Sequence, residues 1–223
     1  MREGSAVAQI NSSGQSVPHA CVICAPTIES ALSEAEKLAA AAVCSGSGAR
    51  PCGKCRDCRK AAEHVHPDII TVSRLLDDKG RPKREIGVDQ IRDVIADAQV
   101  LPNEAARKVY IIDRAETMNA AAQNCLLKTL EEPPERTVFF LITDQPAALL
   151  PTIVSRCRVV RFHPLTEEAC AARLIALGQP PETAKKKARM AEGCVGRALE
   201  SDDSQLDLRM ELTHQVFSVH HPA

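Results

Sequence analysis

Short apolar runs alternate with amphipathic segments along most of the chain. Segments whose apolar residues recur at helical spacing cover 28–43, 119–132 and the stretch marked by Val88, Ile91 and Ile95. The apolar runs between them have the length and composition of buried strands; they are 20–25, 68–72, 108–113, 137–143 and 157–162. Apolar strands that alternate with helices predict an α/β fold, in which helices cover both faces of a parallel sheet.

The pattern changes after "HPLT" (163–166). From there the apolar spacing is helical throughout, over 167–177, 182–192 and from 195 onward. We therefore expect two domains, an α/β domain over 1–163 and a helical domain over 164–223.

Composition narrows the class of protein. With 44% hydrophobic and 26% charged residues, the chain is expected to form a packed core rather than to be disordered. The net charge of -1 argues against bulk electrostatic binding of nucleic acid, although it leaves room for a local basic patch. No run is long enough for a membrane span and the N-terminus lacks a signal-peptide core, so a cytoplasmic protein is expected.

One charged loop, 77–85, could form such a basic patch. It holds Lys79, Arg81, Lys83 and Arg84. These side chains could touch DNA phosphates or a protein partner, but no aromatic residue lies among them to stack on bases. We interpret the segment as a solvated loop.

Four cysteines lie close together in the sequence after the first predicted helix. Cys44, Cys52, Cys55 and Cys58 follow the spacing C-x7-C-x2-C-x2-C. Four thiolates within so short a segment suit a tetrahedral zinc ion. An iron–sulfur cluster is the other metal group that this spacing admits, but the C-x3-C-P ending of bacterial ferredoxins is missing. In a cytosolic protein a disulfide framework is not expected.

The turn between the first strand and the first helix occupies the place of a phosphate-binding loop. That loop requires G-x-x-x-x-G-K-[ST], in which glycines let backbone N–H groups surround phosphate and lysine supplies charge. The chain instead has "APTIESAL" over 25–32, with Ala31 at the lysine position and Leu32 at the hydroxyl position. Glu29 adds negative charge where a phosphate would lie. We predict that this chain does not hydrolyse ATP.

The third strand supports the same interpretation. Asp113 follows "KVYII", where a magnesium-binding aspartate would stand in an ATPase, but the next residue is Arg114 rather than an acid. An aspartate that caps the following turn accounts for Asp113 equally well.

Several segments together resemble a known family. They are the four-cysteine segment, "HPDIITV" (66–72), "KVYIIDRAETMNAAAQNCLLKTLEEPPERTVFFLIT" (108–143) and "LLPTIVSRCRVVRFHPLTEE" (149–168). They resemble the AAA+ clamp-loader subunits of bacterial DNA polymerase III, from about His19 to Arg197. Because the phosphate loop is lost, the resemblance favours the delta-prime branch of that family over the ATP-hydrolysing tau/gamma branch.

The resemblance implies an architecture and a set of partners. It implies an AAA+ five-stranded parallel sheet with an inserted zinc module at 44–58, then a small helical lid domain. The family's helical collar, which forms the ring, would be absent from this chain. The implied partners are the tau/gamma and delta subunits, the sliding clamp and, through the complex, primer-template DNA.

Two arginines acquire expected roles from the resemblance. In relatives the arginine of "SRC" (155–157) reaches ATP held by the neighbouring subunit, so Arg156 is the expected arginine finger. A planar guanidinium can bind the γ-phosphate through two hydrogen bonds. Arg197 stands where relatives carry the sensor arginine of the lid, although a salt-bridge role fits it as well.

Two other functions remain open at this point. An ATP-hydrolysing clamp-loader subunit with an unusual loop would bind ATP as an isolated chain. A zinc-dependent DNA-binding or interaction module unrelated to replication would bind duplex DNA without partners.

Overall fold

The computed structural model describes residues 18–162, 165–191, 193 and 195–200. The chain divides into two compact units, and the division falls between Phe162 and His163, next to the point where the sequence pattern changes. The part of the predicted helical domain beyond Glu200 lies outside the described residues.

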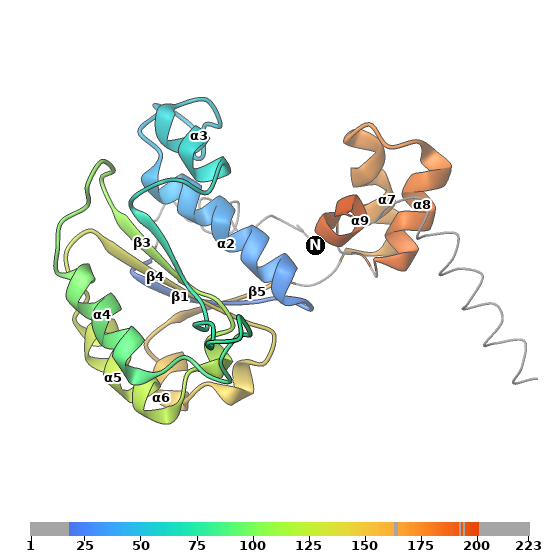
Figure 1. Ribbon diagram of the computed structural model, residues 1–223. Coiled ribbons are helices and arrows are strands. Elements are labelled where there is room, and N and C mark those ends of the chain that lie inside the picture. The colour runs from blue at the N-terminus through green and yellow to red at the C-terminus, as the bar shows by residue number, and fades with distance from the viewer. Residues whose placement is uncertain (1–17, 163–164, 192, 194, 201–223) are drawn as a thin grey trace, which may run out of the picture. The chain divides into compact units, whose positions relative to one another are not determined.

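Unit 1 is built on one parallel sheet (Figure 1). Its strands are β1 Ala20–Cys24, β2 Ile69–Val72, β3 Lys108–Ile112, β4 Thr137–Thr143 and β5 Arg158–Arg161. Their order across the sheet is β2-β3-β4-β1-β5, and every neighbouring pair is parallel. The predicted parallel sheet is confirmed, and each strand lies within its predicted apolar run.

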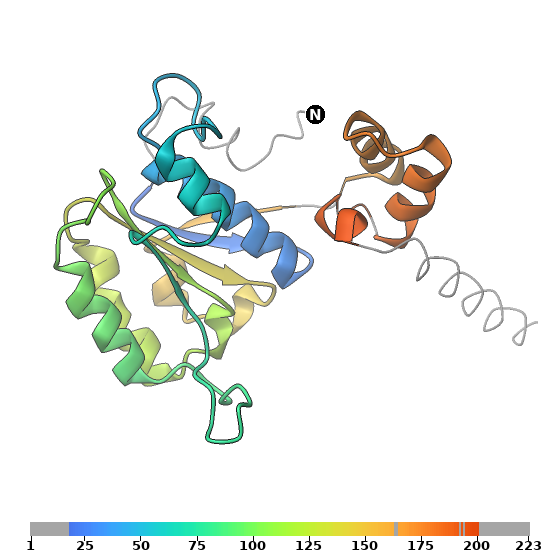
Figure 2. The ribbon, with the colours of Figure 1, turned by 45° about the horizontal axis from the view of Figure 1, so that its top comes forward.

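Helices cover both faces of this sheet. In Figures 1 and 2, α2 and α3 lie on one face and α4, α5 and α6 lie on the other. The bounds of these helices are α2 Ile28–Val43, α3 Arg56–Ala62, α4 Val88–Ala98, α5 Ala120–Glu131 and α6 Pro151–Val154. Short 3-10 turns, η1 Ala115–Thr117 and η2 Pro146–Ala148, follow β3 and β4.

Each face of the sheet has its own apolar core, because successive side chains of a strand point to opposite faces. Cys24 joins the core on the α4 and α5 side, whereas Cys21 joins the core under α2. In the first of these cores the rings of Tyr110 and Phe139 stack with centroids 5.2 Å apart. A sheet buried on both faces explains why the strands read as continuous apolar runs.

Unit 2 is a small helical unit. It consists of α7 Glu167–Ala176, α8 Pro181–Met190 and α9 Val195–Glu200. Its core is made mainly of small residues; they are Cys170, Ala171, Leu174, Ala184, Ala188, Ala191 and Ala198. Gly193, at φ 80°, permits a close approach, since a Cβ there would lie 1.8 Å from the carbonyl oxygen of Leu165.

Within the described residues, no helix has both the length and the apolar character needed to cross a membrane.

Candidate metal centre and arginine site

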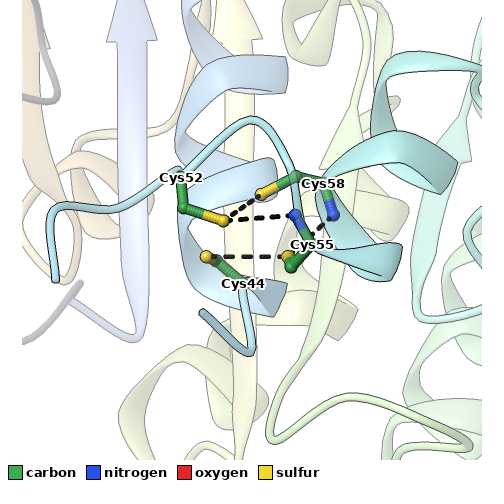
Figure 3. Close-up of side chains that lie close together, drawn as sticks. All are labelled: Cys44, Cys52, Cys55 and Cys58. Atoms are coloured by element: carbon green, nitrogen blue, oxygen red, sulfur yellow. Dashed lines mark hydrogen bonds between the residues drawn. The ribbon is translucent and has the colours of Figure 1, made fainter. Parts of the chain in front are cut away.

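The four predicted cysteines converge in space. The Sγ atoms of Cys44, Cys52, Cys55 and Cys58 all lie within 4.8 Å of one another (Figure 3). Two of these separations are 3.9 Å, for Cys44 and Cys55, and 4.0 Å, for Cys52 and Cys58. Sulfur atoms bound to a tetrahedral zinc at about 2.3 Å would lie about 3.8 Å apart. The arrangement therefore has the ligand type and the spacing of a structural zinc site.

Local structure positions each thiol of this four-cysteine cluster. Cys44 is the residue at which α2 ends, and Cys55 is the N-cap of α3. The backbone N–H of Cys55 donates to Cys52 Sγ, and that of Cys58 donates to Cys55 Sγ, each over 3.3 Å. Such N–H···S bonds orient metal-binding sulfur atoms and stabilise their negative charge.

The same contacts shift the acidity of the thiols. The backbone N–H of Cys58 is the largest cause that lowers the pKa of Cys55, to about 5. Backbone N–H groups of Lys54 and Cys55 likewise lower the pKa of Cys52. Burial raises the pKa of Cys58 to about 12, so this thiol needs a positive ion to become a thiolate. A dication bound in the cluster would supply that charge.

A glycine leaves room for the cluster. A Cβ at Gly46 would lie 2.6 Å from Cys52 Sγ and 3.5 Å from Cys44 Sγ. The first distance is shorter than any tolerable contact, so only glycine lets the chain pass this close to both sulfur atoms. Sequence reasoning missed Gly46, because nothing in the spacing of the cysteines marks it.

A buried carboxylate connects the start of β2 with the loop before β3. Asp68 is fully buried and its two oxygens accept backbone N–H bonds from Asn103, Glu104 and Ala105, at 2.6–2.8 Å. Burial alone would raise the pKa of Asp68, but these N–H groups outweigh it and hold the pKa below its ordinary value. The loop is thereby fixed to the sheet.

The α3 helix is attached to the same loop through charges. Glu104 accepts from Arg56 at 3.1 Å and from Lys60 at 2.5 Å. The next residue of α3, Asp57, lies 3.8 Å from the Nε2 atom of the buried His66. The four-cysteine cluster is therefore joined to the sheet by polar contacts as well as by the chain.

The turn between β1 and α2 is stabilised by a helix cap within the turn. Thr27 is the N-cap of α2, and its hydroxyl oxygen accepts from the backbone N–H of Ser30 over 3.3 Å. Ala31, at the lysine position of a phosphate loop, is fully buried, and Leu32 packs against the core under α2. The side chain of Ala31 is therefore part of the core, and that of Leu32 is partly buried against it.

An ion pair lies beside this turn. Glu29, in the first turn of α2, is 3.7 Å from the guanidinium of Arg114, which follows Asp113 at the end of β3. Both side chains are in contact with solvent, with 39% of Arg114 and 67% of Glu29 accessible, so the pair adds little stability. The two residues that sequence analysis singled out as unlike an ATPase thus face each other.

Arg156 lies between α6 and β5. Its Nε donates to Glu131 Oε1 over 2.6 Å, its Nη2 donates to the same oxygen, and its Nη1 donates to the carbonyl of Thr152 over 2.9 Å. Ser155 donates its hydroxyl to the same carbonyl, at 3.1 Å. Cys157 packs against the core. Sequence reasoning identified Arg156 but not its partner Glu131, because the two residues are 25 positions apart and no motif links them.

The sequence also singled out the basic loop 77–85 and Arg197. The basic loop forms a short hairpin in which Leu76 pairs with Pro82, and its lysine and arginine side chains are exposed. Arg197 lies in α9, and its side chain is not among the described ones.

The architecture and the cluster together define a class of protein. A five-stranded parallel sheet with a four-cysteine segment inserted after the first helix, followed by a separate helical unit, is of the AAA+ clamp-loader type. The profile of the family described as "DNA polymerase III, delta subunit" matches residues 5–166. The chain belongs to that family, and the predicted resemblance is confirmed.

Curated relatives carry matching names. The chain is 36% identical over 163 residues to DNA polymerase III subunit delta' of Bacillus subtilis, a match that covers 73% of the chain and 47% of the relative. It is 37% identical over 155 residues to subunit delta' of Escherichia coli, covering 68% and 44%. Subunit tau of B. subtilis is 36% identical over 124 residues, covering 56% and 21%. The chain thus spans less than half the length of these relatives.

Two solved structures are similar to part of this chain. The B. subtilis DNA clamp loader delta protein has a TM-score of 0.49 and 15% identity, and the match covers 86% of this chain and 53% of that one. A DNA polymerase III gamma subunit-related protein of Thermotoga maritima has a TM-score of 0.40 and 28% identity, covering 59% and 47%.

Proposed function

We propose that this chain is a non-hydrolysing, delta-prime-type subunit of the DNA polymerase III clamp loader. In that role it binds tau/gamma and delta subunits, activates ATP hydrolysis on a neighbour and helps to load the sliding clamp on primer-template DNA. Unit 1 corresponds to the AAA+ core and unit 2 to the lid. Family membership and the names of the relatives support the proposal that the chain belongs to the DNA polymerase III clamp-loader complex.

The main observation that supports a non-hydrolysing role is the turn between β1 and α2, where a phosphate-binding loop would lie. A phosphate site needs free backbone N–H groups and a cation at the helix N-terminus. Here the hydroxyl of Thr27 takes up one N–H, and the position of the lysine is the buried Ala31. The exposed carboxylate of Glu29 in the first helical turn repels a phosphate. These features favour the delta-prime type over an ATP-hydrolysing tau/gamma type.

Arg156 is the group that acts on the neighbour's ATP in this proposal. Its guanidinium carries a permanent charge and is about one-third exposed, with 32% of its side-chain surface accessible. Placed against a γ-phosphate, it stabilises the charge that spreads over the oxygens as the bond to the leaving group breaks. Fingers of this kind increase hydrolysis by roughly 10³–10⁵-fold in well-studied GTPases.

The four-cysteine cluster is proposed to bind Zn²⁺ as a structural ion. The donor set of four sulfur atoms, their spacing and the space left by Gly46 fit that ion. Zinc would supply the positive charge that the buried thiol of Cys58 requires, and would stabilise α3 against the rest of unit 1.

The test is ATP turnover by a clamp loader reconstituted from cognate subunits, with clamp and primed DNA. We expect Arg156→Ala in this subunit to lower turnover by at least about tenfold. Gel filtration would show that parent and variant assemble equally well. Unchanged turnover in a fully assembled complex would contradict the role of Arg156.

A further inference from the structure

Arg156 is held by acceptors on two different helices. Glu131 Oε1 accepts from both Nε and Nη2, and the carbonyl of Thr152 in α6 accepts from Nη1. Hydrogen bonds between two charged groups are roughly twice as strong as neutral ones. The guanidinium is therefore fixed at three nitrogens, although its side chain reaches the surface.

The position of Glu131 is unfavourable for a carboxylate unless a cation is nearby. Glu131 is the last residue of α5, where the helix dipole places partial negative charge. Its neighbour Glu132 adds further negative charge at the same helix end. The contact with Arg156 offsets this repulsion, so the pair stabilises both the helix end and the orientation of the arginine.

The two helices that supply the acceptors are themselves joined. The buried side chain of Gln123 in α5 accepts from the backbone N–H of Leu150, at the start of α6, over 2.8 Å. Gln123 also donates to the carbonyl of Met118 over 3.0 Å. The acceptors of Arg156 therefore belong to a connected frame rather than to a free loop.

The contacts leave Arg156 able to bind phosphate. A guanidinium has five N–H donors, and the hydrogen bonds to Glu131 and Thr152 use one on each nitrogen. No other described residue accepts from this guanidinium, so one N–H remains on Nη1 and one on Nη2. Two parallel donors are what a bidentate contact with a phosphate requires.

We propose that Glu131 is the positioning residue for Arg156: it holds the guanidinium so that its two free donors meet the γ-phosphate of the neighbouring subunit. This inference rests on the proposed function. Glu131 does not touch ATP in this scheme. It removes the need to immobilise a flexible arginine during the reaction, and small errors in such placement are costly to rate.

The chain offers a matched control for the test. Glu131→Ala removes both hydrogen bonds to Arg156, whereas Glu132→Ala removes the same charge from the same helix end without a described contact to Arg156. In the reconstituted complex, we expect Glu131→Ala to lower the kcat for ATP about tenfold, with KM within about twofold of the parent. Glu132→Ala should turn over like the parent. Glu131→Gln, whose amide oxygen still accepts both bonds, should lie between the parent and Glu131→Ala.

A double-mutant cycle separates positioning from general structural damage. If Glu131 acts through Arg156, adding Glu131→Ala to the Arg156→Ala complex lowers turnover no further. An equal further loss in that background would overturn the inference. So would a Glu131→Ala complex as fast as the parent or faster, when Arg156→Ala alone is slow. Unchanged turnover in Arg156→Ala would instead refute the proposed role of Arg156 itself.

Discussion

At the scale of single residues, Asp68 shows how one buried charge can organise a segment distant in the sequence. Its carboxylate accepts three backbone N–H bonds from the loop 103–105 and one from the side chain of Asn103. An ionised carboxylate can accept at both oxygens, whereas an amide can accept at only one. The ionised form of Asp68 is therefore the one that the fold requires.

We predict that Asp68→Asn destabilises unit 1 by about 3 kcal/mol at neutral pH, because the amide nitrogen would face backbone N–H donors. The measurement is urea unfolding followed by fluorescence of Tyr110, the chain's only tyrosine, which lies in β3 of unit 1. Asp89→Asn, at an exposed side chain of α4, is the control and should change stability by less than about 0.5 kcal/mol.

The same variant should also change the pH dependence of unfolding. Because the folded pKa of Asp68 is lowered, its stabilisation is complete above the ordinary carboxyl pKa of about 3.9 and is lost as the pH falls through the folded pKa. The parent and Asp68→Asn should therefore converge at acid pH. A constant difference at every pH would contradict this account.

At the scale of elements, the sequence was most informative where local patterns decide the structure. The apolar runs predicted the strands, and α2 has the bounds that its spacing predicted. In contrast, α3 was missed, because its residues are charged or small and carry no apolar period. That helix begins where Cys55 caps it through its sulfur, within a cluster that brings together distant positions.

Some residues of the candidate sites could likewise be recognised from the sequence, and others could not. The four cysteines and Arg156 carry recognisable spacing or a motif, so their sequence was enough to select them. Gly46 and Glu131 are defined only by what they contact in three dimensions. No periodicity or motif reports such contacts.

We predict that removal of the proposed Zn²⁺ unfolds α3 while the sheet persists. The helix has only seven residues, and its N-cap Cys55 and its residue Cys58 belong to the four-cysteine cluster, so the proposed ion would contribute much of its stability. Hydrogen exchange before and after treatment with a strong chelator is the measurement. Amides of 52–62 should lose protection, and those of β4 should keep it. Equal protection of α3 in both states would show that a metal does not stabilise it.

At the scale of the whole molecule, two compact units follow each other along the chain, and only unit 1 carries the described sites. The turn after β1 lies where a nucleotide-binding loop would lie in an ATPase of this fold. Ala31 and Leu32 in this turn and helix pack against the core, and Glu29 forms an ion pair with Arg114. The sheet needs this strand, turn and helix whether or not a nucleotide binds.

We predict that the chain by itself shows no saturable binding of ATP with magnesium, because buried Ala31 stands at the lysine position of the phosphate loop and Glu29 places a carboxylate in the first turn of α2. Isothermal titration calorimetry of the isolated chain is the measurement, and a cognate tau subunit provides the positive control. Stoichiometric binding of ATP would instead favour the ATP-hydrolysing type of subunit.

The strand order has a consequence for how the protein is made. β1 precedes every other strand in the chain, yet it pairs with β4 and β5, the last two. At about 5–20 residues per second, a ribosome needs on the order of ten seconds to supply those partners. During that time the fully apolar "ACVIC" has both edges unpaired and is prone to aggregate. Its first available partner is α2, which follows it directly and can cover the face of β1 that carries Cys21 and Ile23, whereas the strand edges stay unpaired until β4 and β5 are made.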